Sequence, residues 1–394
     1  GRTDEAARQA LASLDHAPIG TLHAFARRIL NDFPIDAGLP PGFGVLDELD
    51  SNLRFDDEWS DLLDRLLRDP DPDSPLDGGR TLVELCNFEN FGVDKDFKKV
   101  ALDFRHNWDL IESVVDLSDP GPFILPTNDV IAAARTIANT ETPPGDKQAD
   151  LVDVIGRAAE ELAGAEQLSA ELDALAGLTK LIGKPMRKGS KANWKSLGEE
   201  RLTALREAEQ QLVDDIEGVL RRAKAYRKRL VGAIAGRFVL DAVRRRVEGG
   251  VLDFHDLLVH ARKLLAADDH EWIRRALHER YERVLLDEFQ DTDPIQLEIA
   301  VRLTARPDDP QQVDDWRRLT PLPGRLLIVG DPKQSINPLR RADIRQYQRA
   351  AEQVGADTAR HSANLRSTSA VKDITHDVFD PVKPLEPHTP VTKT

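Results

Sequence analysis

The sequence is poor in sulfur and in aromatic residues, and it lacks any long apolar run. One cysteine, one methionine and 5% aromatic residues occur among its 394 positions. A single cysteine, Cys86, excludes an internal disulfide framework and fits a reducing compartment, so we expect a cytoplasmic protein. No secretory leader opens the chain and no apolar stretch is long enough to span a bilayer, so no membrane partner is expected. Because Met186 is the only methionine, we interpret the chain as a piece of a longer polypeptide.

The net charge of −15 is unevenly distributed. Acidic residues collect at 56–73 and 160–173, and basic residues at 184–195 and 221–229. Each basic segment carries one aromatic residue, Trp194 or Tyr226, and single-stranded nucleic acid favours this mixture of charge and stacking ring. Lys188, Lys191 and Trp194 are therefore candidate DNA contacts. A solvated helix face with one amphipathic ring is the alternative interpretation.

The chain is long enough for two or three domains. A loop rich in proline and glycine at 34–43 follows a predicted strand at 19–22 and a predicted helix at 24–30. From about residue 45 to 245 the apolar spacing is chiefly helical, as in Leu151, Ile155, Ala159 and Leu162. Strand-like apolar runs return after residue 250. We therefore expect an α/β domain that carries a large all-helical insertion.

Two apolar runs near the end of the chain stop at polar residues of a specific kind. The run at 284–286 is followed by Asp287 and Glu288, and the run at 326–329 by Gly-Asp-Pro-Lys-Gln-Ser at 330–335. Ligands of parallel sheets bind at the carboxyl ends of the strands. Asp287 is placed to hold Mg²⁺ through water, and Glu288 to polarise an attacking water for nucleoside triphosphate hydrolysis. For this pair alone, a strand that simply ends in two acids is an equal alternative.

Six segments, in the correct order, resemble motifs of the superfamily-one DNA helicases, nearest to the RecB/AddA branch of the UvrD-like group. These segments are Thr21–Phe25 (motif Ia), Gly250–Leu258, Asp287–Pro294 (motif II), Gly330–Ile336 (motif III), Arg340–Ile344 and Asn364–Ser367 (motif IV). The resemblance covers residues 5–380. It implies a RecA-like parallel-sheet motor domain, incomplete here, with a helical insertion. The implied cofactors are ATP and Mg²⁺, and the implied partners are single-stranded or partly duplex DNA and other subunits of a helicase–nuclease complex.

The resemblance also implies a division of the chain and a role for each matched residue. The start of the motor lobe would be 1–44, the helical insertion 45–245, the rest of the lobe 246–380, and a tail 381–394. Asp287 would hold the metal and contact the nucleotide, with Glu288 as the catalytic carboxylate. The other nucleotide-site residues would be Gln290 in a network that joins nucleotide to DNA, Gln334 as the γ-phosphate sensor, and Arg366 as an arginine finger.

On the DNA side, the resemblance implies that Thr21, His23 and Phe25 lie along the track of the single strand, with Arg340 as a further contact. A core role for Phe25 is equally open, because apolar residues surround it on the predicted helix.

Several positions depart from the family pattern. Asn337 and Leu339 stand where motif III usually has aromatic rings, Leu365 replaces an aromatic of motif IV, and His255 replaces the first acid of an F-D-D element. Loss of the rings should weaken the grip on single strands or move it elsewhere, since stacking contributes about 1–3 kcal/mol per base.

The sequence contains no G-x-x-x-x-G-K-[ST] phosphate loop and no second motor lobe. Our first hypothesis is most of the first motor lobe of an ATP-dependent DNA helicase or helicase–nuclease for recombinational repair of DNA ends, inactive as an enzyme in isolation. The second hypothesis is a non-catalytic DNA-binding or scaffolding subunit that keeps the helicase fold.

Overall fold

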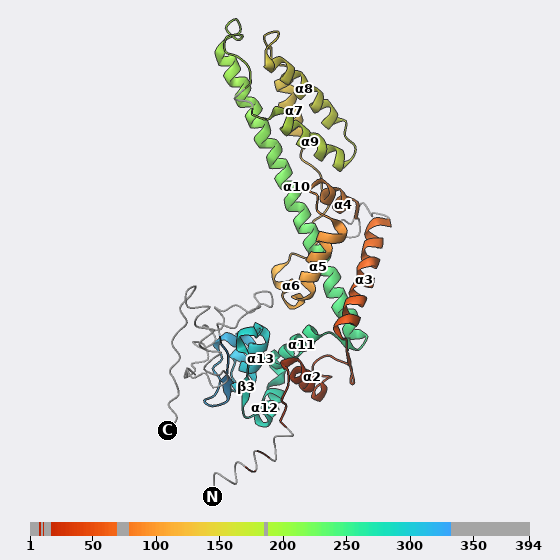
Figure 1. Cartoon of the computed structure of the whole chain (residues 1–394), viewed down its shortest axis with the longest axis vertical. Coiled ribbons are helices and arrows are strands. Elements are labelled where there is room, and N and C mark those ends of the chain that lie inside the picture. The colour runs from red at the N-terminus through yellow and green to blue at the C-terminus, as the bar shows by residue number, and fades with distance from the viewer. Residues whose placement is uncertain (1–7, 9–10, 12–16, 69–78, 185–187, 332–394) are drawn as a thin grey trace, which may run out of the picture. The chain divides into compact units, whose positions relative to one another are not determined.

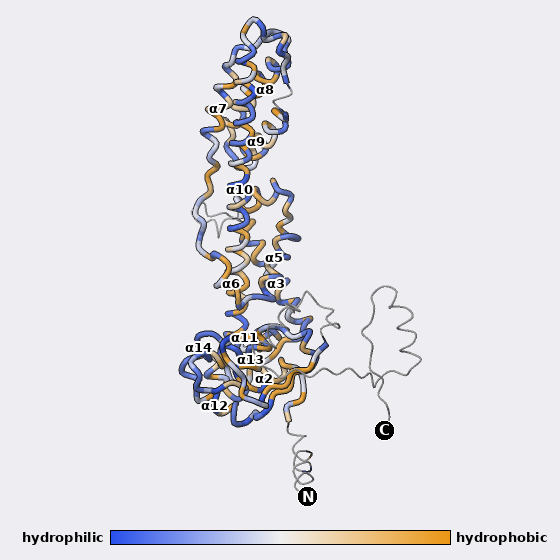
Figure 2. The backbone as a smooth tube through the Cα atoms, turned by 90° about the vertical axis from the view of Figure 1, so that its left-hand side faces the viewer, coloured by the Kyte–Doolittle hydropathy of each residue, from blue (hydrophilic) through white to orange (hydrophobic). Residues whose placement is uncertain are grey.

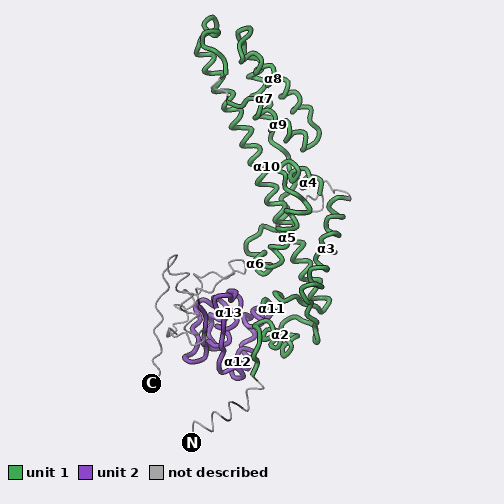
Figure 3. Tube along the Cα trace, in the orientation of Figure 1, with its two compact units in different colours: residues 1–260 green, residues 261–394 purple. Residues whose placement is uncertain are grey.

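The computed structural model (Figure 1) describes residues 8, 11, 17–68, 79–184 and 188–331. The chain forms two compact units, residues 1–260 and 261–394 (Figure 3). Within the described ranges, the helices are too short or too polar to cross a membrane.

In the first unit, helix α2, Leu22–Asp32, confirms the helix predicted at 24–30. The strand predicted at 19–22 is wrong. Thr21 is the N-cap of α2, and its side-chain oxygen accepts a hydrogen bond from the backbone N–H of Ala24 at 3.2 Å. This capping bond satisfies a backbone donor that would otherwise lack a partner, so the helix starts at Leu22 and replaces the expected strand.

Two short parallel strands lie at the two ends of the helical region at 48–248. Strand β1, Gly44–Val45, pairs with β2, Val251–Leu252, in the register Gly44↔Val251. The backbone N–H of Leu46 also donates to the Leu252 carbonyl at 2.8 Å. The chain therefore leaves this sheet after β1 and returns to it about two hundred residues later at β2.

Between these strands the described chain is helical apart from its loops. The helices are α3 Glu48–Arg68, α4 Gly79–Phe88, the π-helix η2 Val93–Phe97, α5 Lys98–Arg105, α6 Trp108–Val114, α7 Asn128–Ala138, α8 Lys147–Ala163, α9 Leu168–Ile182 and α10 Glu199–Glu248. Helix α10 has 50 residues and contacts α3, α4, α5, α6, α7 and α9. Figure 2 shows hydrophobic and hydrophilic residues alternating in short stretches along these helices, the pattern of helices that bury one face.

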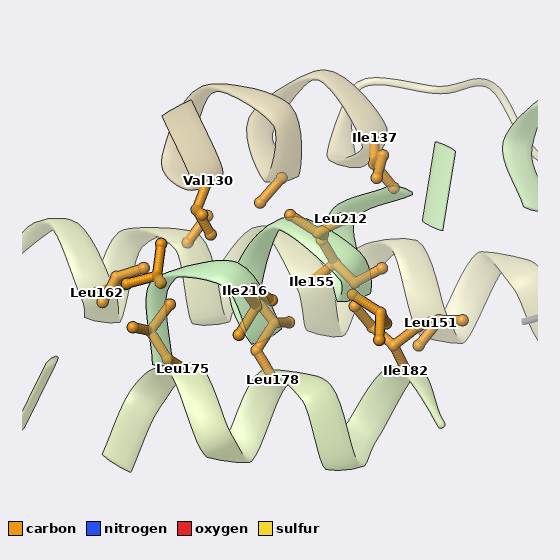
Figure 4. Packing of buried hydrophobic residues seen from close by; sticks show 14 of the residues in the cluster. Val130, Ile137, Leu151, Ile155, Leu162, Leu175, Leu178, Ile182, Leu212 and Ile216 are labelled. Atoms are coloured by element: carbon orange, nitrogen blue, oxygen red, sulfur yellow. The ribbon is translucent and has the colours of Figure 1, made fainter. Parts of the chain in front are cut away.

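Helices α7, α8, α9 and α10 share one hydrophobic core (Figure 4). The four α8 residues expected from their spacing, Leu151, Ile155, Ala159 and Leu162, are all buried. Side chains from the other helices meet them, among them Val130, Ile137, Leu175, Leu178, Leu212 and Ile216. The helical spacing of the sequence is therefore confirmed as a core-forming face.

The second unit carries the two strands predicted near the end of the chain. Strand β3, Val284–Leu286, pairs in parallel with β4, Leu326–Ile328, in the register Val284↔Leu326. The remaining elements are η4 Asp268–His270, α12 Glu271–Arg280, η5 Phe289–Asp291, α13 Pro294–Thr304, α14 Gln311–Asp314 and η6 Trp316–Arg318. Helix α11, Phe254–Ala266, contains the point at which the two units divide. Together the described elements form small parallel sheets with a large helical region, which agrees with an incomplete α/β domain.

Candidate functional site

The ends of β3 and β4 bring the two predicted motifs side by side. Backbone pairing continues past both strands: Val329 N–H donates to the Leu286 carbonyl at 2.8 Å, and Phe289 N–H to the Val329 carbonyl at 3.0 Å. Asp287 and Glu288 therefore lie between the two residues, Leu286 and Phe289, that bond to Val329, the residue before Gly330. The acids of motif II and the first residues of motif III therefore meet at one edge of the sheet, where ligands of parallel sheets bind.

Gln290 joins the two motifs through both ends of its side-chain amide. Its Nε2 donates to Glu288 Oε2 at 2.5 Å, and its Oε1 accepts a hydrogen bond from the backbone N–H of Asp331 at 2.9 Å. The side chain is only 7% exposed, so these bonds form largely out of water. An amide is one of the few side chains that can donate at one end and accept at the other.

Glu288 has a left-handed backbone, with φ 50° and ψ 43°. This conformation is uncommon for a residue with a Cβ, and such residues concentrate at functional sites. Asp287 Oδ1 accepts a hydrogen bond from the Glu288 N–H at 2.9 Å. The turn exposes both carboxylates at the end of the strand.

Gly330 is required by close packing. A Cβ at this position would lie 2.8 Å from Gln290 Oε1 and 3.1 Å from the Phe289 backbone nitrogen. A side chain at this position would therefore require Gln290 or the end of β4 to shift.

The strand-end acids suit a magnesium ion that is shared with a nucleotide. Mg²⁺ in such sites takes one or two protein carboxylates and completes its shell with water and phosphate oxygens. The described residues contain no cluster of three or more histidine, cysteine or acidic side chains that could hold a metal by themselves. The exposed carboxylates of Asp287 and Glu288 fit a site in which Mg²⁺ is also coordinated by water and by the phosphate oxygens of a nucleotide.

A pocket between α2, β1 and α11 holds two of the residues predicted to contact DNA. Its lining residues are Thr21, His23, Ala24, Arg27, Val45, Leu46, Asp47, Phe254 and Leu257. The ring of His23 meets that of Phe254 edge to face, with 5.7 Å between their centroids. Phe25 is half-buried and is absent from the lining.

Phe254 was not predicted as a site residue. It is 50% exposed and presents an aromatic ring to the pocket, next to Arg27 and His23. The sequence offered one indication that Phe254 belongs to a site, because it lies inside the segment 250–258 that resembles a helicase motif. The contact with His23 could not be inferred, because the two rings are far apart in the sequence.

Three residues predicted to contact DNA, Lys188, Lys191 and Trp194, lie in the basic loop between α9 and α10, and the structure contradicts the prediction for one of them. Trp194 is 0% exposed and belongs to the core of α7–α10, so the predicted role of its ring in stacking on DNA is wrong. Lys188 is half-buried, and its Nζ donates to the Leu181 carbonyl at 2.8 Å. Lys191 is 69% exposed and lies 3.4 Å from Glu199.

The second basic segment, at 221–229, is largely paired within the chain. Arg227 lies 2.5 Å from Glu89, and Arg229 lies 2.9 Å from Asp116. Tyr226 stacks on Phe123 with 4.4 Å between centroids, and its hydroxyl donates to the Gly121 carbonyl. These contacts favour the structural interpretation of this segment.

Three predicted site residues, Gln334, Arg340 and Arg366, lie outside the residues that the structure describes.

Comparison with known proteins identifies the family. Residues 2–355 match the UvrD/REP helicase N-terminal domain. The chain belongs to the UvrD/REP helicase family. It is 24% identical to an ATP-dependent helicase/nuclease subunit of Pediococcus pentosaceus, over 95% of this chain and 32% of that protein.

This helicase domain also matches a second group of relatives, the RecB subunits of RecBCD enzymes, over shorter stretches. It is 34% identical to the RecBCD enzyme subunit RecB of Mycolicibacterium smegmatis, over 33% of this chain and 10% of that protein. The corresponding subunit of Chlamydia pneumoniae is 33% identical over 31% of this chain and 10% of its own length. The chain thus spans about a third or less of these relatives. Helicases of this family use ATP together with a divalent metal.

Proposed function

We propose that this helicase domain forms most of the first motor lobe of an ATP-dependent DNA helicase or helicase–nuclease that acts in recombinational repair of DNA ends. The observation that carries the proposal is the Gln290 amide, which connects the acid of motif II to the backbone of motif III. The relatives named as an ATP-dependent helicase/nuclease and as RecB support the choice of reaction.

In the nucleotide site, Asp287 would hold Mg²⁺ and Glu288 would polarise the attacking water. Bound ATP would supply the electrophilic phosphorus, and Mg²⁺ would offset the negative charge of the phosphate oxygens. The two carboxylates have different contacts, because Asp287 Oδ1 accepts from the Glu288 N–H and Glu288 Oε2 accepts from Gln290 Nε2, so they can serve these different roles. Gln290 holds the Glu288 carboxylate in place with its hydrogen bond. Gln334 and Arg366 would complete the site as γ-phosphate sensor and arginine finger.

On the DNA side, the pocket of α2 and α11 would hold part of a single strand. His23 and Phe254 offer rings on which bases can stack, and Arg27 offers a guanidinium for a phosphate. Thr21 lies at the pocket, but its side chain also caps α2, so its substitution affects the helix as well. Lys191, exposed at the far end of the insertion, is a second candidate phosphate contact.

The test of this function is Glu288→Gln in the full-length parent protein. The amide keeps the shape of the side chain and removes its basicity, so ATP turnover should be lost while Mg-ATP binding is retained. Glu282→Gln, an exposed acid just before β3, is the matched control and should leave turnover unchanged. Equal loss of binding and turnover in Glu288→Gln would show that Glu288 is not the base.

A further inference from the structure

The segment Asp253–Asp256, which follows β2, is tied to the helical region by two ion pairs and by one histidine–aspartate hydrogen bond. The first of these joins Asp256 to Arg246 on α10. The guanidinium donates two hydrogen bonds of 3.0 Å to the two carboxylate oxygens, and the side chains are 6% and 0% exposed. Bidentate pairs of this kind fix orientation as well as position.

The second pair joins Asp253 to α5. Arg105 lies 3.5 Å from Asp253 Oδ2, which also accepts a bond from the hydroxyl of Ser51 at 3.2 Å. Burial alone would raise the pKa of Asp253, but Arg246, the backbone N–H of His255 and Arg105 together hold it below its usual value. Asp253 therefore stays ionised and paired.

The third pair joins His255 to α6. His255 Nε2 lies 3.0 Å from Asp109 Oδ1, and the side chains are 17% and 1% exposed. The ring of Trp108 meets the His255 ring at nearly a right angle, with 6.4 Å between centroids. Asp109 on α6 and Asp253 on its own segment are thus the acids that face His255.

Phe254 is the one member of this four-residue segment whose side chain enters the pocket. The residues on either side of it, Asp253 and His255, are each held by the insertion, while the Phe254 ring is 50% exposed against His23. The direction of the Phe254 ring therefore depends on how its two neighbours are anchored.

We infer that Asp109 is a positioning residue for the DNA pocket: through its side-chain hydrogen bond with His255 it holds the ring of Phe254 where a base can stack. This inference rests on the proposed function, because it assigns Phe254 to the DNA site. It also accounts for the unusual histidine. Where the resembling helicases have an acid at this position, this chain has His255, and the acid stands across from it at Asp109 on the insertion. The insertion thereby contributes to the grip on the strand without touching it.

The test measures binding of a short oligothymidine strand that carries a single 2-aminopurine, using the chain as it exists. Stacking on an aromatic ring quenches 2-aminopurine fluorescence, whereas contact with phosphates alone does not. Phe254→Ala should reduce both the quenching and the affinity, by about tenfold for the loss of one stacked base. Asp109→Asn, which keeps the side-chain shape, should approach the same values. Glu112→Gln removes an exposed acid from the same helix and should change neither.

Exchange of the two partners separates positioning from folding. His255→Asp should weaken quenching, because it sets two acids against each other in a buried site. The double variant Asp109→His with His255→Asp restores a histidine–aspartate pair with its members exchanged and should recover most of the quenching. If Phe254→Ala lowers quenching but Asp109→Asn does not, or if the exchange fails to recover it, the positioning role is overturned. If Phe254→Ala changes neither the quenching nor the affinity, the pocket does not bind DNA and the proposed function of the pocket is wrong.

Discussion

The side-chain amide of Gln290 spans the gap between Glu288 and the backbone N–H of Asp331, with a hydrogen bond at each end of 2.5 and 2.9 Å. Because Glu288 follows β3 and Asp331 follows β4, this one side chain connects the two strand ends. We therefore expect a change in the position of either motif to affect the other.

Gly330→Ala should disturb this connection. Its new Cβ would lie 2.8 Å from Gln290 Oε1 and 3.1 Å from backbone, so the amide must move or β4 must shift. We expect a loss of about 1–3 kcal/mol of stability, as for other overpacked sites, together with reduced ATP turnover in the parent protein. Denaturant unfolding and steady-state turnover measure the two effects.

Gly177→Ala is the matched control for this substitution. Gly177 lies inside α9, and a Cβ there meets no atom within 4 Å. Alanine should stabilise this helix by about 0.5–1 kcal/mol. If both glycine substitutions had the same effect, close packing at Gly330 would not be the cause.

The stability of the insertion should depend on pH through Glu209. This α10 carboxyl is 0% exposed and accepts a hydrogen bond from Gln148 Nε2 at 3.2 Å. Burial raises its pKa from 4.5 to about 7, against smaller opposing effects of Gln148, Lys188 and Arg206. The folded state therefore favours the protonated acid. Stability is greatest below the unfolded pKa and falls as pH rises from about 4.5 to about 7.

The expected loss over this window is about 3 kcal/mol, from the difference between the two pKa values. Unfolding monitored at about pH 5 and about pH 8 measures it, and Glu209→Gln should abolish the difference. Burial would raise the pKa of the nearby Asp146, but hydrogen bonds from Gln148, Ser190 and Asn193 hold it below its usual value. Asp146 therefore affects stability only at more acidic pH. If the stability of Glu209→Gln still changed with pH as in the wild type, another group would be responsible for the pH dependence.

Binding of single-stranded DNA should depend on salt through Lys191. This lysine is 69% exposed, and its ion pair with Glu199 is of the kind that contributes little in water. If it contacts a phosphate, Lys191→Ala should lower the slope of log affinity against log salt by about 0.7. Lys224→Ala, next to Glu89 in the self-paired segment, is the control and should leave the slope unchanged. If the slopes of log affinity against log salt were identical for wild type and Lys191→Ala, Lys191 would not contact a DNA phosphate.

Features encoded by local patterns could be predicted from the sequence. The parallel strands β3 and β4 followed from apolar runs that end in polar residues, and the core face of α8 followed from its helical spacing. The strand expected at 19–22 failed because Thr21 caps a helix with a single side-chain bond. In that short stretch, one local hydrogen bond outweighed weak strand propensity.

Side-chain direction and long-range pairing could not be predicted in the same way. Trp194 lies in a basic segment, yet its indole turns into the core, since the charge of neighbours does not determine where a ring points. Likewise, the partners of His255 and Phe254 are Asp109 and His23, which only the folded chain brings near. His23 and Phe254 line the pocket that we propose for DNA, so its composition required the structure.

The most direct test of the proposed function is ATP turnover by the full-length parent protein with and without single-stranded DNA, for wild type and Gln290→Ala. The control is Gln311→Ala, which alters an amide on α14. We predict that DNA stimulates wild-type turnover and that Gln290→Ala keeps Mg-ATP and DNA binding but loses the stimulation. Stimulation that survives in Gln290→Ala would contradict the role of this side chain as the connection between the motifs. A wild-type protein without any DNA-stimulated turnover would favour a non-catalytic DNA-binding protein instead.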